Sequence, residues 1–345
     1  ALYRAAPDES MEAIEAFQAG LVVWIRKRGQ LSAGVLRSEQ LCYPEPPFSA
    51  AVMQQLQNSN YTSNRIELAT SNLARPSEIY AFDLNHCSIQ RISNPAREDL
   101  QDYHASQVLV SSSDGAKIPV SLLSTDSLAN ITPGPLVLYA YGAYGHTAEP
   151  TFNRERMPLL EAGVTYAIAH VRGGGYLGHG WHDRGRAEQK IRAIEDYLAI
   201  ARNLVERGVT QRGKIAAWGR SAGGAIVASA VNTDPSLFGA IILESPFVDV
   251  TNTMLSPDLP LTAREYSEWG DPRDAVGLKN MLVWAPYENI SSQAYPATLI
   301  SIGGRDPIVP FWEGLKWGIK VRAHQTGTAP VSYTHLTLPT RRGGG

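Results

Sequence analysis

Gly219-Arg220-Ser221-Ala222-Gly223 is the stretch of sequence that decides the fold. A strand-like run, Lys214 to Trp218, precedes it, and a run of small residues typical of a helix, Gly224 to Val231, follows. G-x-S-x-G between a strand and a helix is typical of a nucleophile elbow, where a sharp turn lifts a serine hydroxyl above the sheet. The pattern predicts Ser221 as a nucleophile and the Ala222 N–H, at the helix N-terminus, as a donor to an oxyanion. A tight packing turn is the alternative interpretation.

Buried strands and a helical pattern surround this motif. Apolar residues recur near the 3.6-residue period between Ile191 and Leu204, and the pattern ends at Arg207-Gly208, which is typical of a helix C-terminus. Strands that alternate with helices predict a mostly parallel sheet with helices on both faces, the α/β-hydrolase fold. The predicted strands are Pro135–Tyr139, Val164–Ala169, Lys214–Trp218 and Ala297–Ile302.

The first hundred residues have a different pattern. Short hairpins, among them Leu21–Arg28 with Leu31–Arg37 and Glu78–Leu84 with Ser88–Ile92, suit the blades of a β-propeller or a β-sandwich. We therefore expect a β domain over residues 1–100 and a hydrolase domain over residues 101–329.

A serine nucleophile needs a base and an acid that orients the base, and in this fold the chain order is serine, acid, histidine. Asp306 follows the last apolar strand and is the predicted acid; a turn aspartate before proline is the alternative. Of the later histidines, His324 fits a solvated position on a helix, and His335 lacks flanking glycines. The sequence therefore predicts no histidine in the position of the base.

Composition excludes several classes of function. Lys and Arg number 31 against 33 Asp and Glu, a formal net charge of −2, which argues against a nucleic-acid partner. No apolar run reaches the roughly 18 residues of a transmembrane helix, so we expect no membrane association. Cys42 and Cys87 fit no metal-site spacing and are predicted to be free thiols. Sparse cysteines suggest the cytoplasm.

The two ends of the chain differ from the rest. No charged-then-apolar signal follows Ala1, and the N-terminus is interpreted as truncated. Residues 330–345 show neither a helical nor a strand period that continues what precedes them, and they resemble translated sequencing-adaptor DNA. We interpret them as a non-native tail; a genuine flexible tail is the alternative.

Several motifs together resemble the prolyl oligopeptidase family, and most closely its oligopeptidase B branch. Family members join an α/β-hydrolase domain to a seven-bladed β-propeller, so the resemblance implies that residues 1–100 are the last one or two blades. The motifs that carry it are Tyr141–Gly145, Val171–Gly178, Gly219–Gly224, Pro246–Val250 with Thr253–Leu255, and Pro260–Thr262 with Glu265, Glu268, Trp269 and Gly270.

The resemblance implies roles for individual residues. Ser221 matches the nucleophile, Asp306 the acid, and Tyr141 the oxyanion-hole tyrosine that acts with the Ala222 N–H. Glu265 matches a carboxylate that binds a Lys or Arg side chain at P1, the residue before the cleaved bond. Tyr144 matches an aromatic wall of that pocket, and Glu268 and Trp269 are expected at the substrate as well.

This chain departs from the family pattern at two places. Ser267 stands where oligopeptidase B members tend to carry a second acid, which weakens the expected basic specificity. The family's histidine follows in a Gly-His-Gly type loop that this chain does not reach, so we expect the chain as given to be inactive.

The resulting hypothesis is a serine oligopeptidase that cleaves short peptides after Lys or Arg, with no metal or organic cofactor. An esterase or acylaminoacyl-type peptidase on the same fold is one rival, and a catalytically inactive binding module is another.

Overall fold

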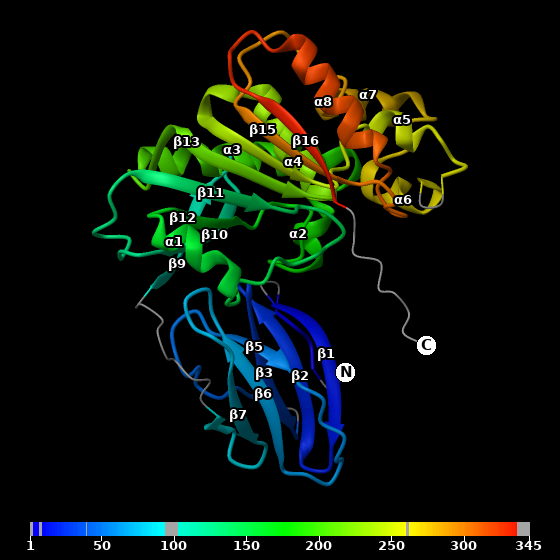
Figure 1. The fold of residues 1–345 in the computed structure, drawn as a ribbon. Coiled ribbons are helices and arrows are strands. Elements are labelled where there is room, and N and C mark those ends of the chain that lie inside the picture. The colour runs from blue at the N-terminus through cyan, green and yellow to red at the C-terminus, as the bar shows by residue number, and fades with distance from the viewer. Residues whose placement is uncertain (1–2, 7–8, 39, 94–102, 260–261, 337–345) are drawn as a thin grey trace, which may run out of the picture.

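The computed structural model describes residues 3–6, 9–38, 40–93, 103–259 and 262–336. Two four-stranded antiparallel sheets form the N-terminal part, drawn in blue at the bottom of Figure 1. Trp24 and Val35 of the first sheet pack with Leu68 and Phe82 of the second in one hydrophobic core, as expected for neighbouring blades. The first sheet consists of β1 (Glu9–Phe17), β2 (Gly20–Lys27), β3 (Gln30–Arg37) and β4 (Gln40–Cys42), and the second of β5 (Val52–Gln55), β6 (Arg65–Ser71), β7 (Glu78–Asp83) and β8 (Ser88–Ser93).

A disulfide joins Cys42 and Cys87, so the prediction of two free thiols was wrong. Cys42 ends β4 in the first sheet, and Cys87 lies in the turn between β7 and β8 of the second. Packing of the two sheets brings their Cα atoms to 6.2 Å, although 45 residues separate them in sequence. Such a distance lies within the range that a disulfide can bridge.

The C-terminal part is built on one eight-stranded sheet with the order β16-β15-β14-β13-β11-β12-β10-β9. The strands from β12 to β16 along this order are mutually parallel, and β9 and β10 pair antiparallel at one edge. The predicted α/β-hydrolase fold is thus confirmed. The strands are β9 (His104–Ser111), β10 (Lys117–Ser124), β11 (Gly134–Ala140), β12 (Thr165–Ala169), β13 (Thr210–Arg220), β14 (Phe238–Glu244), β15 (Ala297–Gly303) and β16 (Val331–Leu336).

Helices cover both faces of this sheet (Figure 1). On one face α3, α4 and α8 bury residues such as Ile200, Val227 and Trp317, and on the other α1 packs Leu160 near Ile168. The helices are α1 (Met157–Glu161), α2 (His179–Asp183), α3 (Ile191–Glu206), α4 (Ala222–Thr233), α5 (Val250–Met254), α6 (Thr262–Trp269), α7 (Ala275–Trp284) and α8 (Trp312–His324), with short 3-10 turns at Arg154–Arg156, Ala187–Gln189 and Pro235–Leu237. No helix among the described residues is long and apolar enough to cross a membrane.

The last described strand corrects one expectation about the C-terminal stretch. Residues 331–336, for which no strand period was predicted, form β16 and pair in parallel register with β15. The foreign origin of residues 330–345 stays a prediction, as do the domain limits. The limit between residues 100 and 101 lies outside the described residues.

The two parts of the molecule meet beneath the sheet. Arg26, 4% exposed, donates to Glu12 of its own sheet and forms an ion pair with Glu149 of the hydrolase part. Next to this contact, the His170 ring stacks on Tyr176 at 3.5 Å between centroids, and its Nε2 lies 2.8 Å from the Ser121 hydroxyl. Burial, followed by the charge of Arg26, lowers the pKa of His170 to about 3, so this histidine is neutral.

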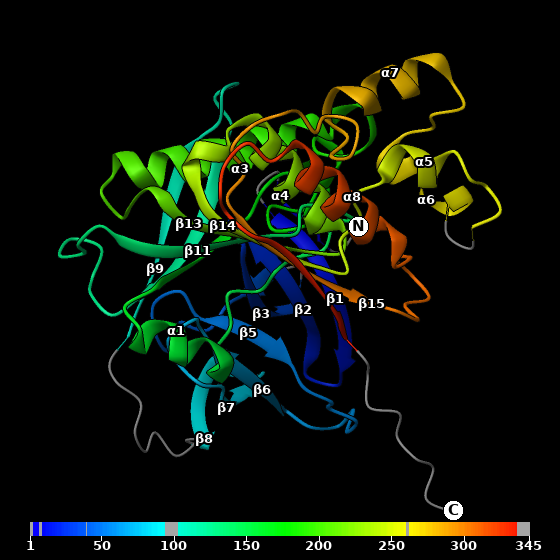
Figure 2. The ribbon, with the colours of Figure 1, turned by 45° about the horizontal axis from the view of Figure 1, so that its top comes forward.

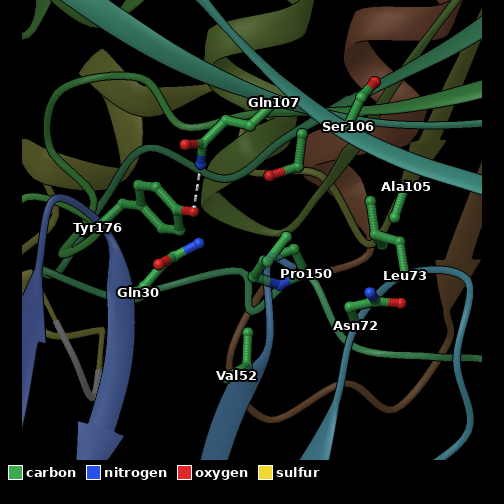
Figure 3. Close-up of a pocket in the computed structure, with 11 residues that line it drawn as sticks. Gln30, Val52, Asn72, Leu73, Ala105, Ser106, Gln107, Pro150 and Tyr176 are labelled. Carbon is green, nitrogen blue, oxygen red and sulfur yellow. Dashed lines mark hydrogen bonds between the residues drawn. The ribbon is translucent and has the colours of Figure 1, made fainter. Parts of the chain in front are cut away.

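A small cavity lies at this junction, between Gln30, Val52 and Asn72 of the N-terminal sheets and Gln107 and Tyr176 of the hydrolase part (Figure 3). Its volume is about 10 Å³, which is the space of a single water. It is therefore too small to be a substrate site.

Candidate active site

The turn around Ser221 has the crowded geometry of a nucleophile elbow. β13 ends at Arg220 and α4 begins at Ala222, so Ser221 alone makes the turn, at φ +52° and ψ −123°. A Cβ atom on Gly219 would lie 2.4 Å from the carbonyl oxygen of Gly223, and one on Gly223 would lie 2.3 Å from that of Ala140. Residues 219 and 223, two positions before and after the serine, must therefore be glycine, and the positive φ of Ser221 is held by this packing.

Backbone hydrogen bonds fix the elbow to its neighbours. The Ser221 N–H donates to the carbonyl oxygen of Glu244 on β14 at 2.9 Å, and the Phe247 N–H donates to that of Ser221 at 3.0 Å. Ala222 opens α4, so its N–H belongs to the first-turn donors that have no acceptor within the helix. The elbow thus combines a rigid serine with an available anion-binding N–H.

Tyr141 lies directly after β11 and lines the same cavity as Ser221. Burial raises the pKa of Tyr141, and a hydrogen bond with Ser221 offsets part of that rise. The phenol is therefore protonated near neutral pH, and its O–H lies within reach of the serine side chain. This arrangement fits a donor to an oxyanion that forms beside Ser221.

A cavity of about 230 Å³ opens above Ser221. α5 and α6, which contribute one side of it, lie together beyond the edge of the sheet in Figure 2. Its floor comes from the elbow and Tyr141, and its remaining walls are mostly apolar. The lining residues are Tyr141, Tyr144, Ser221, Ala222, Phe247, Thr253, Met254, Leu259, Thr262, Glu265 and the turn Pro307–Pro310.

Glu265 is the carboxylate of this cavity, and two donors orient it. The Tyr144 hydroxyl donates to Oε2 of Glu265 at 2.7 Å, and Trp269 Nε1 approaches the same oxygen at 3.0 Å and the Tyr144 hydroxyl at 2.9 Å. Burial and then the hydrogen bond to Glu265 raise the pKa of Tyr144, which keeps it a donor. Among the described residues Oε1 of Glu265 has no hydrogen-bond partner, so it is free to accept from a bound cation.

Neither Glu268 nor Trp269 lines the cavity among the described residues, and their contact with the substrate stays a prediction. Glu268, 4% exposed, accepts from Lys190 Nζ at 2.7 Å and lies 2.7 Å from His182 Nε2. Although burial raises the pKa of Glu268, the contacts with Lys190 and His182 outweigh it and leave that pKa below its ordinary value. Trp269 donates from Nε1 to the Glu265 carboxylate.

Lys190 connects this buried carboxylate to the oxyanion side of the site. Its ammonium is fully buried, lies 3.3 Å from the carbonyl oxygen of Gly142, and sits 4.5 Å from the centre of the Trp269 ring. Lys190 thus joins the loop after Tyr141 to α6, the helix that carries Glu265. The sequence did not single out Lys190, because its position in the chain bears no sign of these distant partners.

Asp306 lies in the turn after β15, at the carboxyl edge of the sheet where Ser221 also lies. Its Oδ1 accepts from the N–H groups of Ile308 at 2.9 Å and Val309 at 3.0 Å, which fixes the turn whose residues 307–310 line the cavity. No histidine is among the described residues that line the cavity. His324 ends α8 with Nδ1 2.8 Å from the Lys320 carbonyl oxygen, and the backbone of His335 pairs with Ile302 in β16.

Some residues of the predicted motifs lie outside the described residues, and some residues of the cavity had no predicted role. Pro260 and Leu261, which the family resemblance includes, lie outside the described residues. The cavity residues that sequence reasoning did not assign are Phe247, Thr253, Met254, Leu259, Thr262 and Pro307–Pro310. Phe247, Thr253, Met254 and Thr262 lie within the motifs that carry the family resemblance, which was the signal that could have found them.

The fold and this site define an α/β hydrolase with its serine at the nucleophile elbow. The chain belongs to the prolyl oligopeptidase family, whose sequence profile matches residues 150–334.

Individual relatives support the oligopeptidase B resemblance. The chain is 32% identical to Protease 2 of Moraxella lacunata over 308 residues, 88% of this chain and 43% of that protein. It is 32% identical over 330 residues to Dipeptidyl aminopeptidase BI of Pseudoxanthomonas mexicana, which is 94% of this chain and 46% of that protein. The solved structure of Oligopeptidase B from Leishmania major superposes with a TM-score of 0.88 at 30% identity, covering 96% of this chain and 48% of that one. The chain thus spans about half the length of these relatives.

Proposed function

We propose that this chain carries the catalytic domain of a serine oligopeptidase that hydrolyses short peptides after Lys or Arg. The observation that carries the proposal is the Glu265 carboxylate in the same cavity as Ser221. A carboxylate in a partly desolvated pocket rewards a cationic side chain through a charge-assisted hydrogen bond. The cavity, about 230 Å³, is smaller than the roughly 300–1,000 Å³ of sites that enclose a drug-sized ligand, which suits one side chain.

The proposed mechanism assigns one role to each of these groups. The Ser221 hydroxyl attacks the scissile carbonyl, and a histidine takes its proton and returns it to the leaving amine. Asp306 orients that imidazole, while the Tyr141 O–H and the Ala222 N–H donate to the oxyanion. Glu265 binds the P1 cation. The inactivity of the chain as given stays a prediction.

Two rival functions remain on the same site. The apolar walls formed by Phe247, Met254 and Leu259 favour an esterase or acylaminoacyl-type peptidase as the second candidate. A binding module without catalysis would leave Ser221 unreactive toward a fluorophosphonate. The expected cytoplasmic location loses the support of free cysteines, because Cys42 and Cys87 form a disulfide.

The test compares matched peptidyl-Arg and peptidyl-Phe amides on any form of the protein that hydrolyses either amide, as wild type, Ser221→Ala and Glu265→Gln. We expect Ser221→Ala to abolish hydrolysis, and Glu265→Gln to lower kcat/KM for the Arg substrate about 10- to 150-fold, the equivalent of about 1.5–3 kcal/mol. The Phe substrate should change far less. Equal losses on both substrates would favour the rival enzyme. Glu155→Gln, a charge change on an exposed residue outside the cavity, is the control.

A binding measurement separates the pocket from catalysis. Benzamidine carries a planar cation like that of an Arg side chain, and its affinity for the chain can be measured by titration calorimetry. We expect Glu265→Gln to weaken benzamidine binding by a similar factor, whether or not the chain hydrolyses peptides. Unchanged affinity would contradict the assignment of Glu265 to P1.

A further inference from the structure

The second residue of α8, Glu313, is a carboxyl group that the proposed mechanism does not use. Its side chain is fully buried, and it does not line the cavity. α8 begins soon after the Asp306 turn, so this helix continues directly from the acid side of the site. A buried carboxyl group is costly unless it is hydrogen-bonded, so its partners are informative.

Three donors from one segment meet this carboxyl group. Oε2 of Glu313 accepts from the N–H groups of Val248 at 2.8 Å and Asp249 at 2.5 Å. Oε1 accepts from the hydroxyl of Thr253 on α5. A second contact from the same helix reinforces the first, because Lys316 pairs with the Asp249 carboxylate. The start of α8 therefore holds the segment 247–253 at several points.

That segment builds one wall of the substrate cavity and supports the nucleophile. Phe247, Thr253 and Met254 line the cavity, and the Phe247 N–H donates to the carbonyl oxygen of Ser221 at 3.0 Å. Any shift of the segment would change both the wall and the support of the elbow. Misplacement by about 1 Å far from the reacting atoms can cost an enzyme about a hundredfold in rate.

We propose that Glu313 is a positioning residue of this site, which holds the cavity wall in the form that binds the P1 side chain. The inference rests on the proposed function for its substrate, and on the contacts above for its mechanism. Glu313 acts through Val248, Asp249 and Thr253 and does not touch the substrate.

The electrostatic surroundings of Glu313 make its hold on the wall depend on pH. Burial, with a smaller contribution from the Asp249 carboxylate, raises the pKa of Glu313 to about 7, against the hydrogen bonds from Thr253 and the backbone. Among the described residues, the other titratable groups near Glu313 and Asp249 are Glu288, Lys316, Lys320 and Tyr287.

The direction of this pH dependence follows from the raised pKa. A raised carboxyl pKa means that the folded state favours the protonated form, so this stabilisation is present at low pH and is lost as pH rises through about 7. In the protonated form, one oxygen still accepts from the two N–H groups while the O–H donates to the Thr253 hydroxyl. Ionisation places a second buried negative charge beside Asp249 and weakens the wall.

Two variants of Glu313 test the proposal on the full chain. Glu313→Gln keeps one acceptor and one donor without charge, whereas Glu313→Leu has similar size and no hydrogen bonds. We expect Glu313→Leu to bind benzamidine at least about tenfold more weakly, since it leaves buried N–H groups unsatisfied. Glu313→Gln should restore wild-type affinity near pH 6. The proposal is overturned if Glu313→Leu binds benzamidine as tightly as wild type does. It is also overturned if Glu313→Leu and Glu313→Gln both fold and lose the same amount of affinity.

The pH profile is the readout that a purely structural role would not change. Wild-type affinity for benzamidine should fall between about pH 6 and pH 8, and that of Glu313→Gln should stay flat over the same range. A parallel fall in both would contradict a role for Glu313 ionisation. If Glu313→Leu does not fold, Thr253→Val removes one of the three bonds, and unchanged affinity in that variant refutes the positioning role.

Hydrogen exchange separates this proposal from the proposed function. Mass spectrometry of peptides that cover residues 247–254 reports the Val248 and Asp249 amides without any ligand. Exchange should be faster in Glu313→Leu than in wild type and Glu313→Gln; equal exchange contradicts the positioning role. If exchange is faster only in Glu313→Leu and the wild-type chain binds no benzamidine, the proposed preference for Lys or Arg is wrong. The role of Glu313 in positioning residues 247–254 is then still supported.

Discussion

The buried pair of Lys190 and Glu268 gives the sharpest stability prediction. Their side chains are 0% and 5% exposed, and Nζ and Oε1 lie 2.7 Å apart. Lys190→Met leaves the Glu268 carboxylate with His182 as its remaining side-chain partner, and Glu268→Gln leaves the ammonium with the Gly142 carbonyl oxygen and the Trp269 ring. Removing one member of a buried pair costs about 3–5 kcal/mol, because the other charge stays buried without compensation.

The double variant should be far less damaging than the sum of the two single variants. It leaves no stranded charge, so we expect its free energy of unfolding to lie at least about 2 kcal/mol above the additive value. Urea unfolding followed by tryptophan fluorescence measures this, since Trp269 lies directly against the Lys190 ammonium. Lys279→Met, a change of an exposed lysine, should alter the free energy by less than about 0.5 kcal/mol. If the changes in unfolding free energy of Lys190→Met and Glu268→Gln simply add in the double variant, the ion pair is not what stabilises this part of the protein.

Three other predictions concern stability. The buried neutral His170 has a pKa lowered from 6.5 to about 3, so its contribution to stability is present above pH 6.5 and is lost as pH falls toward 3. Between pH 6.5 and pH 5, wild type should lose about 1.6 kcal/mol more unfolding free energy than His170→Asn, measured by urea titration. Gly219→Ala should lower the melting temperature and abolish fluorophosphonate labelling in any form of the protein that labels, because the new Cβ meets the Gly223 carbonyl oxygen. Gly180→Ala is the control, since Gly180 has open space around it, and it should change neither the melting temperature nor the labelling. Cys42→Ser opens a disulfide that spans 45 residues and should cost up to about 4 kcal/mol of unfolding free energy, and an unchanged melting curve would exclude a stabilising role.

The parts of the fold that depend on local physics could be predicted from the sequence. The elbow is one case, since crowding at Gly219 and Gly223 arises from atoms within the turn and on the neighbouring strand. The β2–β3 hairpin is another, although the predicted strands Leu21–Arg28 and Leu31–Arg37 put its turn at Gly29-Gln30, one residue late. Arg28 and Gly29, both at positive φ, form the two-residue loop, and Gln30 already pairs with Lys27. Four of the parallel strands, β11, β12, β13 and β15, were predicted as apolar runs, whereas β14 and β16 were not predicted.

The parts that depend on distant partners could not be predicted. Cys42 and Cys87 are adjacent only because two sheets pack together, and spacing alone contains no such information. Glu268 resembles a second pocket acid in the sequence, yet it pairs with Lys190, 78 residues earlier, and does not line the described cavity. Glu313 likewise has no motif, since the groups that it holds lie 60 to 65 residues away. Burial of charge is a property of the assembled molecule.

The Cys42–Cys87 disulfide has a practical consequence for handling the protein. It closes residues 43–86 into a covalent ring, and the ring includes a surface segment around Tyr61, whose side chain is 58% exposed. Exposed segments of this kind are preferred sites of protease cleavage. A single cut there would leave both fragments attached, so damaged and intact molecules would migrate together on a non-reducing gel. Only a gel run after reduction would reveal how much of a preparation has been clipped.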